Sequence, residues 1–517
     1  MFKNYIKKNL NKTYVIDIAF LSVLAILFFY FGYHDVFFSE PFGIHYMRQT
    51  DSLSFASNYY NHGFKFFSPE LYNLKNMDGK AACEFPFTYY ITALLYSIFG
   101  KQFFIQRIVH IVIAYFGVFC SYRLALLILK DKVYAVLVGL IVFSSTVFNY
   151  YAFNYLPDIP ALGLVFAGWY FFYKYLTDEK RSSLIFMLLF FTLGSLIKVT
   201  YLINLLSIIS YSILIVLVLR EKVALPRGKK IIWTGLISVF LVVVWNIYMI
   251  HYNTINESSS FNTKALPIWG MTKENIHFVW ELITNYWYKQ YFPKSIFHLF
   301  YAIFFLQIIL IKKGNKQFST VLLILFLANL SYLILFYSQF RDHDYYFLAF
   351  FPVFILVLIN GLKTLQNITS NKIIHLIIQL VVAVLLVSGV NFSRVRVYKR
   401  FDKKIDKYSQ AGLIIHEHNN SIKQLNIPKE SRFIVAPDLC QNGGLFFLDK
   451  KGWNLTPDQI NIENIVELKN RGAQYLLMVT KDSALLSGAD STGMRIFENL
   501  EIAIFKLKEE EENHVER

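Results

Sequence analysis

The sequence predicts a polytopic α-helical membrane protein that ends in a small α/β domain. Hydrophobic residues make up 55% of the 517 positions and charged residues only 17%, a balance outside the range of soluble globular chains. Apolar runs of about twenty residues, the length that a helix needs to cross a bilayer, alternate with short basic clusters. From about residue 391 the apolar runs shorten. These observations divide the chain into a membrane part, residues 1–390, and a C-terminal part, residues 391–517.

The membrane part is expected to contain about eleven transmembrane helices. The first covers residues 14–33, and a long outer loop, residues 34–102, follows it. A short apolar helix in this loop, residues 87–99, is too short to cross and is expected at the membrane interface. Basic clusters place the alternate short loops on the cytoplasmic side. The later spans with assigned bounds are expected at residues 103–129, 159–176, 184–199, 201–219, 231–250, 347–362 and 373–390.

The charge and cysteine content exclude several classes of function. Lys and Arg outnumber Asp and Glu by 51 to 35, but the basic residues lie in short loops between apolar runs, which is typical of loops facing anionic lipid rather than nucleic acid. Three scattered cysteines are too few for a disulfide framework or a zinc site. A glycine-rich phosphate loop, a metal-spaced His/Cys set and a nucleophile elbow are all missing from the sequence, which argues against a nucleotide-handling enzyme.

The C-terminal part is predicted to be a small α/β domain outside the membrane. The runs "RFIVAP", "LFFLD" and "YLLMV" are short, apolar and rich in strand-forming residues, which predicts three strands. "ENIVELKNRG" predicts an amphipathic helix that ends at Gly472, and "RIFENLEIAIFKLK" predicts a final hairpin. The acidic tail, residues 508–517, is expected to be solvated.

Ionisable residues gather at the predicted outer ends of the spans and in the outer loops. Charged groups at membrane depth cost several kcal/mol unless they are paired or hydrated, so several of them on one side indicate a hydrated, charged cavity. The residues of this set are Asp51, Glu84, Asp158, Lys198, Arg341, His343 and Asp344.

Asp51 has two interpretations. In "RQTDSLSFASNYYNHG", Thr50 fits the N-cap and Asp51 the first turn of a short helix that ends near Gly63, where the helix dipole alone favours an acid. Alternatively, a carboxylate at the mouth of a polar cavity accepts a proton from a hydroxyl held nearby.

The other candidates leave similar alternatives open. Glu84, two residues before Pro86, suits a helix N-terminus or a second carboxylate of the site. Asp158 caps a helix or belongs to the site, and Lys198 snorkels to the interface or reaches a lipid phosphate. In "RDHDYYF", six polar or hydroxylated residues at a span junction favour recognition of a phosphate or diphosphate.

Five motifs in order carry a resemblance to a known family. "RQTD", "EFP", "PDIPAL", "IKVTY" and "HDYY" follow one another across a multispan chain. The set resembles the bacterial GT-C fold membrane glycosyltransferases related to the dolichyl-phosphate-mannose protein mannosyltransferases, over roughly residues 1–390. The resemblance implies a GT-C fold and a transferase that takes a sugar from a polyprenyl-phosphate carrier on the outer face of the membrane.

The resemblance also implies roles for individual residues. Asp51 matches the acid of the first outer loop and becomes the expected general base, with Glu84 as a second catalytic carboxylate. The usual loop motif of the family has two adjacent acids, whereas Ser52 follows Asp51 here, which weakens both a protein acceptor and a metal site. The expected ligands of the donor phosphate are Arg48, Lys198, Arg341 and His343, and the further site candidates are Asp158, Asp344 and Tyr345.

The expected partners are a polyprenyl-phosphate-linked sugar donor, a glycan, lipid or protein acceptor, and membrane lipid, without nucleic acid. The sequence demands no cofactor, and a divalent cation remains compatible with it. The expected location is the bacterial cytoplasmic membrane, with the active site and the C-terminal domain on the extracytoplasmic side. The alternatives are an outer-face glycan ligase or polymerase that uses a diphosphate-linked donor and, with less support, a transporter of lipid-linked sugars.

Overall fold

The computed structural model describes residues 2–219, 225–261, 264–480 and 482–508 and groups the chain into two compact units. The first unit comprises Met1–Phe38, Arg107–Tyr248 and Thr263–Lys399, and the second comprises Ser39–Gln106, Met249–Asn262 and Arg400–Arg517. The second unit therefore combines most of the predicted outer loop with the C-terminal part of the chain. The acidic tail lies, apart from its first residue, outside the described residues.

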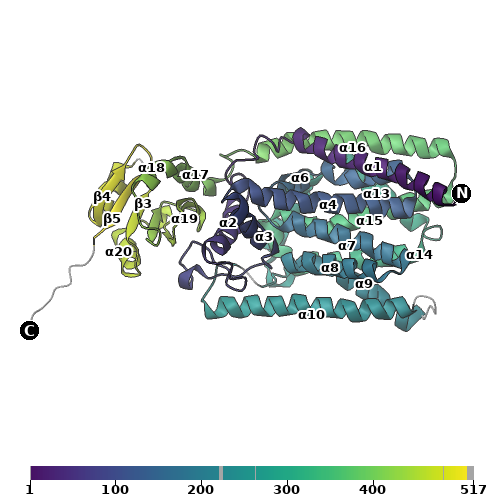
Figure 1. Ribbon diagram of the computed structural model, residues 1–517, viewed down its shortest axis with the longest axis horizontal. Helices are drawn as coiled ribbons and strands as arrows, with labels where there is room; N and C mark the ends of the chain where they lie inside the picture. The colour runs from purple at the N-terminus through teal and green to yellow at the C-terminus, as the bar shows by residue number, and fades with distance from the viewer. Residues whose placement is uncertain (1, 220–224, 262–263, 481, 509–517) are drawn as a thin grey trace, which may run out of the picture. The chain divides into compact units, whose positions relative to one another are not determined.

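The first unit is a bundle of long helices, which Figure 1 draws as roughly parallel ribbons. Three of its helices, α4, α10 and α16, continue into the second unit. The helices are α1 (Phe2–Tyr30), α4 (Phe103–Leu129), α5 (Lys132–Leu140), α6 (Thr146–Ala152), α7 (Asp158–Asp178), α8 (Arg181–Ile197), α9 (Leu202–Ile213), α10 (Leu225–Ile255), α11 (Lys273–Glu281), α12 (Tyr288–Tyr291), α13 (Lys294–Ile309), α14 (Lys316–Leu335), α15 (Phe351–Ile368) and α16 (Lys372–Arg400).

Within the described residues, six helices are long and apolar enough to cross a membrane, or up to eight if two sharply bent helix pairs each count as one span. The helix α4 has the bounds predicted for the second span, and α3 (Phe87–Phe99) has those predicted for the short interfacial helix. The predicted polytopic helical class is thus confirmed. The count of eleven spans stays a prediction.

Close packing in the bundle depends on glycine. A Cβ atom placed on Gly117 of α4 would lie 2.2 Å from the Cα atom of Gly163 in α7, so both helices need glycine at this contact. On α7, a Cβ on Gly168 would lie 2.8 Å from the ring of Phe191 in α8. Small residues let membrane helices approach closely where the hydrophobic effect supplies no driving force. These contacts fix α7, whose first residue is Asp158, between α4 and α8.

The C-terminal residues form a five-stranded sheet with the order β2-β1-β3-β5-β4. The pairs β1–β2 and β1–β3 are parallel, and β5 pairs antiparallel with both β3 and β4. The predicted α/β domain and its final hairpin are confirmed. The strands are β1 (Phe433–Ala436), β2 (Gly452–Asn454), β3 (Tyr475–Met478), β4 (Gly493–Glu498) and β5 (Ala503–Leu507), and the helices are α17 (Gln410–Glu417), α18 (Asn419–Gln424), α19 (Gly443–Leu448), α20 (Ile462–Asn470) and α21 (Ser483–Asp490).

The strand predicted from "LFFLD" is wrong, because this run forms most of the helix α19. A parallel pair of strands needs a crossover connection, and α19 lies in the connection between β1 and β2. Its residues are buried on all sides, which explains why the run is apolar without the periodicity of a surface helix.

The outer loop pairs with β2, the strand at one edge of this sheet. It contains α2 (Tyr46–Asn61) and α3, and its extended segment, residues 72–74, runs parallel to β2. The N–H of Leu74 donates to the carbonyl of Gly452 at 2.7 Å, and the N–H of Gly452 donates to the carbonyl of Tyr72 at 3.0 Å. The segment thereby covers an edge strand that would otherwise present unpaired backbone groups.

Candidate active site

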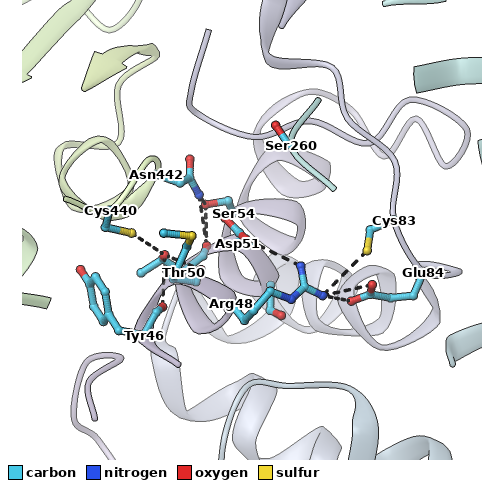
Figure 2. A network of polar contacts seen from close by, with 12 residues as sticks. Tyr46, Arg48, Thr50, Asp51, Ser54, Cys83, Glu84, Ser260, Cys440 and Asn442 are labelled. Atoms are coloured by element: carbon cyan, nitrogen blue, oxygen red, sulfur yellow. Dashed lines mark hydrogen bonds and ion pairs between the residues drawn. The ribbon is translucent and has the colours of Figure 1, made fainter. Parts of the chain in front are cut away.

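A buried charge cluster lies on α2 in the second unit. Arg48 and Asp51 stand three positions apart on this helix, with Nη1 of the arginine 3.7 Å from Oδ2 of the aspartate. The Nη2 atom of Arg48 donates to both carboxylate oxygens of Glu84, at 2.9 and 3.2 Å. Figure 2 shows the guanidinium with interactions to both acids. The side chains of Asp51 and Glu84 are each only 9% exposed, so water screens these charges weakly.

The surroundings of Glu84 hold the guanidinium in one orientation. The hydroxyl of Tyr89, on α3, donates to Glu84, and it also contacts the Ser52 hydroxyl at 3.3 Å. The Arg48 guanidinium lies 5.0 Å from the ring centre of Phe261. Its Nη1 atom makes no hydrogen bond with any described residue. One edge of the guanidinium is therefore fixed by Glu84, and the other is left as a donor beside Asp51.

The protonation of Asp51 is set mainly by its burial. Burial raises the pKa of Asp51, the Arg48 guanidinium opposes this rise, and the Glu84 carboxylate adds to it, which brings the pKa to about 7. A carboxyl group with a pKa near neutrality exchanges a proton readily under physiological conditions, as a general base must.

A loop of the C-terminal sheet supports α2 from the other side. The side-chain amide of Asn442 donates to Ser54 Oγ at 2.5 Å and to the Thr50 carbonyl at 3.4 Å, and the Cys440 thiol lies 3.7 Å from the Thr50 hydroxyl (Figure 2). The carboxylate of Asp438 accepts the backbone N–H groups of Cys440 and Gly444 at 2.8 and 3.0 Å, which orders this loop.

Sequence reasoning missed Tyr89, Asn442 and Asp438. Tyr89 follows Glu84 by five positions within "EFPFTYY", so its place in the chain gave a weak signal. Asn442 lies more than 380 positions from its partners on α2, and nothing in the local sequence "CQNGG" indicates them.

The prediction that Thr50 caps the helix and Asp51 lies in its first turn is wrong. The helix α2 begins at Tyr46, and its N-cap, His45, has a φ of 59° and no side-chain cap. Thr50 Oγ1 donates instead to the Met47 carbonyl at 2.9 Å. Asp51 thus lies beyond the first turn, where the helix dipole has little effect, so capping does not explain it. The predicted end is confirmed, because α2 stops before Gly63, which has a φ of +81°.

A second polar group lies in the first unit, around Lys198 at the junction that follows α8. Its Nζ atom lies 2.9 Å from Oδ1 of Asp158, and 5.0 and 4.8 Å from the ring centres of Tyr345 and Tyr346. Asp158 is the first residue of α7 and caps nothing, because Pro157 occupies the N-cap position. The capping interpretation of Asp158 is therefore wrong, whereas the two interpretations of Lys198 stay predictions.

The polar run at residues 341–346 divides between surface and interior. Arg341 is 56% exposed and lies 3.7 Å from Asp342, also exposed. Asp344 is buried and accepts hydrogen bonds from the hydroxyl of Tyr151, at 2.7 Å, and, through its carbonyl, from Tyr291. The His343 ring stacks on Tyr345, with their centres 5.2 Å apart.

The nine predicted site residues thus fall into two groups, one in each unit. Arg48, Asp51 and Glu84 come together in the second unit, and the other six residues belong to the first. The single hydrated cavity expected for the seven ionisable residues from Asp51 to Asp344 stays a prediction. Among the described residues, no group of three or more His, Cys, Asp or Glu side chains is arranged to hold a metal ion.

Comparisons with known proteins relate this chain to one family model and to several solved structures. The family model named dolichyl-phosphate-mannose-protein mannosyltransferase matches residues 83–248, about a third of the chain, which include Glu84, Asp158 and Lys198. No curated protein matches the chain.

Solved structures match over nearly the whole length. ArnT from Cupriavidus metallidurans in the apo state has a TM-score of 0.59 at 12% identity, covering 96% of this chain and 98% of ArnT. ArnT bound to undecaprenyl phosphate has a TM-score of 0.58 at 12% identity, with 94% and 97% covered. The oligosaccharyltransferase of Archaeoglobus fulgidus, in complex with zinc and sulfate, has a TM-score of 0.53 at 12% identity, with 88% of this chain and 68% of that protein covered.

These similarities define the class of the protein. The chain has the GT-C fold of membrane glycosyltransferases, with a small sheet at its C-terminal end. The GT-C fold that the resemblance of the five motifs implied is thereby confirmed, and the chain is similar in structure to ArnT along nearly its whole length.

Proposed function

We propose that the protein transfers a sugar from a polyprenyl-phosphate-linked donor to a hydroxyl group of an acceptor on the extracytoplasmic face of the bacterial cytoplasmic membrane. The observation that carries this proposal is the buried carboxylate of Asp51, which has a pKa of about 7 and lies 3.7 Å from the Arg48 guanidinium. The GT-C fold and the binding of undecaprenyl phosphate by ArnT support a lipid-phosphate donor. In this proposal residues 1–390 carry the catalytic residues and the membrane helices, and residues 391–517, which begin within α16, carry the extracytoplasmic domain.

In the proposed reaction, Asp51 removes the proton of the acceptor hydroxyl as the oxygen attacks the anomeric carbon of the donor. The bond between this carbon and the phosphate oxygen breaks, and polyprenyl phosphate leaves with the electron pair. Displacement in one step inverts the anomeric centre. The leaving phosphate is already anionic, so it needs cations more than an acid. Arg48 Nη1, which makes no hydrogen bond within the described residues, supplies one such donor.

Glu84 acts on Arg48 rather than on the sugar. Its carboxylate accepts hydrogen bonds from Nη2 of the guanidinium and from the Tyr89 hydroxyl. Few of its lone pairs are therefore left to bind the hydroxyl group of the sugar acceptor. The proposed phosphate ligands Lys198, Arg341 and His343 belong to the first unit, where Lys198 is held by Asp158.

Donor consumption by the purified protein tests the proposed function. We expect the protein to release free carrier from a polyprenyl-phosphate sugar in the presence of cell-envelope glycan, and to leave polyprenyl-diphosphate glycans intact. Mass spectrometry of the extracted lipids measures both. Consumption of the diphosphate donor alone would replace the proposal with a ligase or polymerase, and movement of an unaltered lipid-linked sugar across vesicles would replace it with transport.

The activity is expected to depend on pH through Asp51. A general base works only when deprotonated, so with a pKa of about 7 the value of kcat/KM should rise with pH and level off above neutrality. Below the pKa the rate should fall about tenfold per pH unit. Initial rates measured from about pH 5 to pH 9 test this expectation. A flat profile across that range, with a stable protein, would contradict the assignment of Asp51.

A further inference from the structure

A polar cavity of about 570 Å³ lies in the second unit, away from the charge cluster of Arg48. Its walls come from the end of α2, from the outer-loop segment of residues 65–80 and from residues 429–451 around the sheet edge. This volume falls within the range of about 300–1,000 Å³ that ligand sites occupy.

Two acids in the walls form ion pairs with basic side chains. Glu70 accepts hydrogen bonds from His62 at 2.9 Å and from Lys451 at 2.8 Å, and Lys451 also donates to the Asp78 carbonyl at 2.8 Å. Partial burial raises the pKa of Glu70, but the bonds from His62 and Lys451 outweigh it and bring the pKa to about 2. Glu70 therefore stays ionised, and its hydrogen bonds connect the outer-loop wall to the wall that contains Lys451.

The second engaged acid is Asp449. Its Oδ1 atom accepts from Lys101 at 2.9 Å, from Asn61 at 3.4 Å and from the hydroxyl of Tyr72. Lys101 does not itself line the cavity, so this cation balances a wall carboxylate without adding charge to the lining. The negative charge of both acids is thus already balanced.

The remaining charged side chains of the lining are mostly cations. Two carboxylates, Asp78 and Glu430, face four basic side chains that form no salt bridge with any described carboxylate. These four are Lys65, Lys80, Lys429 and Arg432. The cavity consequently carries surplus positive charge beside rigid, ion-paired walls, which favours an anionic ligand.

The other lining groups suit hydroxyls rather than acyl chains. The amides of Asn58 and Asn61 line the cavity, and Leu74 is its aliphatic member. The Nδ2 atom of Asn58 donates to the Glu70 carbonyl at 2.9 Å, while its buried Oδ1 atom has no hydrogen-bond partner among the described residues. A lipid headgroup would bring acyl chains, for which the lining offers a single aliphatic side chain. A carbohydrate supplies the hydroxyl donors that such groups bind.

The helix α2 joins this cavity to the charge cluster. Asn58 follows Asp51 by seven positions, which is two helical turns, so both residues lie on the same face about 10 Å apart along the axis. Both are buried. The cavity and the proposed base are therefore placed by the same helix, about two turns apart.

We propose that this cavity binds an acidic glycan, one that carries carboxylate or phosphate groups, as the acceptor of the sugar. The inference rests on the proposed function for its acceptor role, whereas the binding of the anionic glycan does not depend on transfer. Carboxylate and phosphate present the same chemistry to the four unpaired cations, so the test contains one probe of each kind.

Binding is measured on the full-length protein in detergent with four probes: oligogalacturonate, a glycerol-phosphate oligomer, neutral maltohexaose and phosphatidylglycerol vesicles. We expect one or both anionic oligomers to bind and the neutral sugar and the vesicles to bind at least tenfold more weakly. Reversing two cations of the lining, in the variant K80E/K429E, should weaken binding of the anionic oligomer at least tenfold. The matched control K423E changes an exposed lysine of the same unit that does not line the cavity and should bind like the wild type.

The experiments test the binding of an acidic glycan and its role as the sugar acceptor separately. Equal binding of the neutral sugar, tighter binding of the vesicles, or unchanged binding by K80E/K429E would overturn the acidic-glycan site. If binding holds and D51N still binds the glycan but transfers no sugar to it, both the site and the proposed base are supported. If K80E/K429E loses binding while transfer to the same glycan keeps its KM, the cavity is a glycan site but the acceptor role is overturned.

Discussion

Replacing Asp51 with asparagine is expected to abolish sugar transfer while leaving a folded protein that still binds carrier lipid. Asparagine has nearly the same shape but accepts no proton at neutral pH, and loss of general-base catalysis typically costs 10²- to 10⁴-fold in rate. Single-turnover transfer with saturating donor measures this loss. The control D458N changes an exposed acid of the same unit and should keep the wild-type rate.

For the same variant, D51N, we also predict a change in thermal stability that does not depend on the catalytic assignment. Because the pKa of Asp51 is raised to about 7 in the folded protein, the native state binds more protons than the unfolded state between about pH 4 and pH 7. Wild-type stability therefore falls as pH rises through this window. Removing the charge should raise the midpoint of thermal unfolding at pH 8 relative to the wild type and change it little at pH 4. Wild-type transfer by a folded D51N protein would refute the catalytic assignment.

Truncation of Glu84 should be among the most destabilising single changes in the second unit. The variant E84A removes the closest partner of Arg48 and leaves a largely buried guanidinium beside one carboxylate 3.7 Å away. Breaking a buried ion pair from one side typically costs about 3–5 kcal/mol, and the 22% exposure of Arg48 places this case toward the lower value. The expected result is a clear fall in the thermal unfolding midpoint, measured by intrinsic fluorescence in detergent.

A double-mutant cycle separates this pairing from simple loss of packing. If E84A destabilises because it leaves the Arg48 guanidinium without its main partner, then R48M/E84A should recover much of the loss, since the guanidinium is gone and burial favours the neutral, protonated form of Asp51. The control E463A removes an exposed acid from α20 and should leave the midpoint unchanged. A double variant no more stable than E84A would show that the Glu84 side chain matters for its volume and not for its charge.

The membrane helices could be predicted from the sequence because one physical constraint dominates them. A span needs about twenty apolar residues, and this length alone sets the bounds of α4 and shows that α3 is too short to cross. In the C-terminal sheet, strand-forming composition identified β1 and β3 but failed for "LFFLD", where burial on all sides and not strand geometry makes the run apolar. The strand β2 was missed because three residues carry no periodic signal.

The candidate site could be predicted only in part. Polar residues that stand out against an apolar background identified Asp51, Arg48 and Glu84, since a buried charge is costly and needs a reason. The ion pair between Arg48 and Glu84 was not predicted. The sequence around Glu84 is the same whether this acid lies at a helix terminus or binds Arg48. Asn442 and Tyr89 were missed, since a polar residue that supports a site through hydrogen bonds differs in no visible way from one that faces solvent.

The pairing of the outer loop with β2 has a consequence for how the protein is made. The backbone of Tyr72 bonds to Gly452, and its N–H donates to Asn442, 370 positions further along the chain. During synthesis the loop that carries Asp51 emerges early, whereas the residues that complete its hydrogen bonds emerge near the end. Contacts of such large sequence separation form late in folding. The hydrogen bonds that Asn442 makes to Tyr72 and to α2 can thus form only after the last membrane helices have been synthesised, so the support of α2 is completed late.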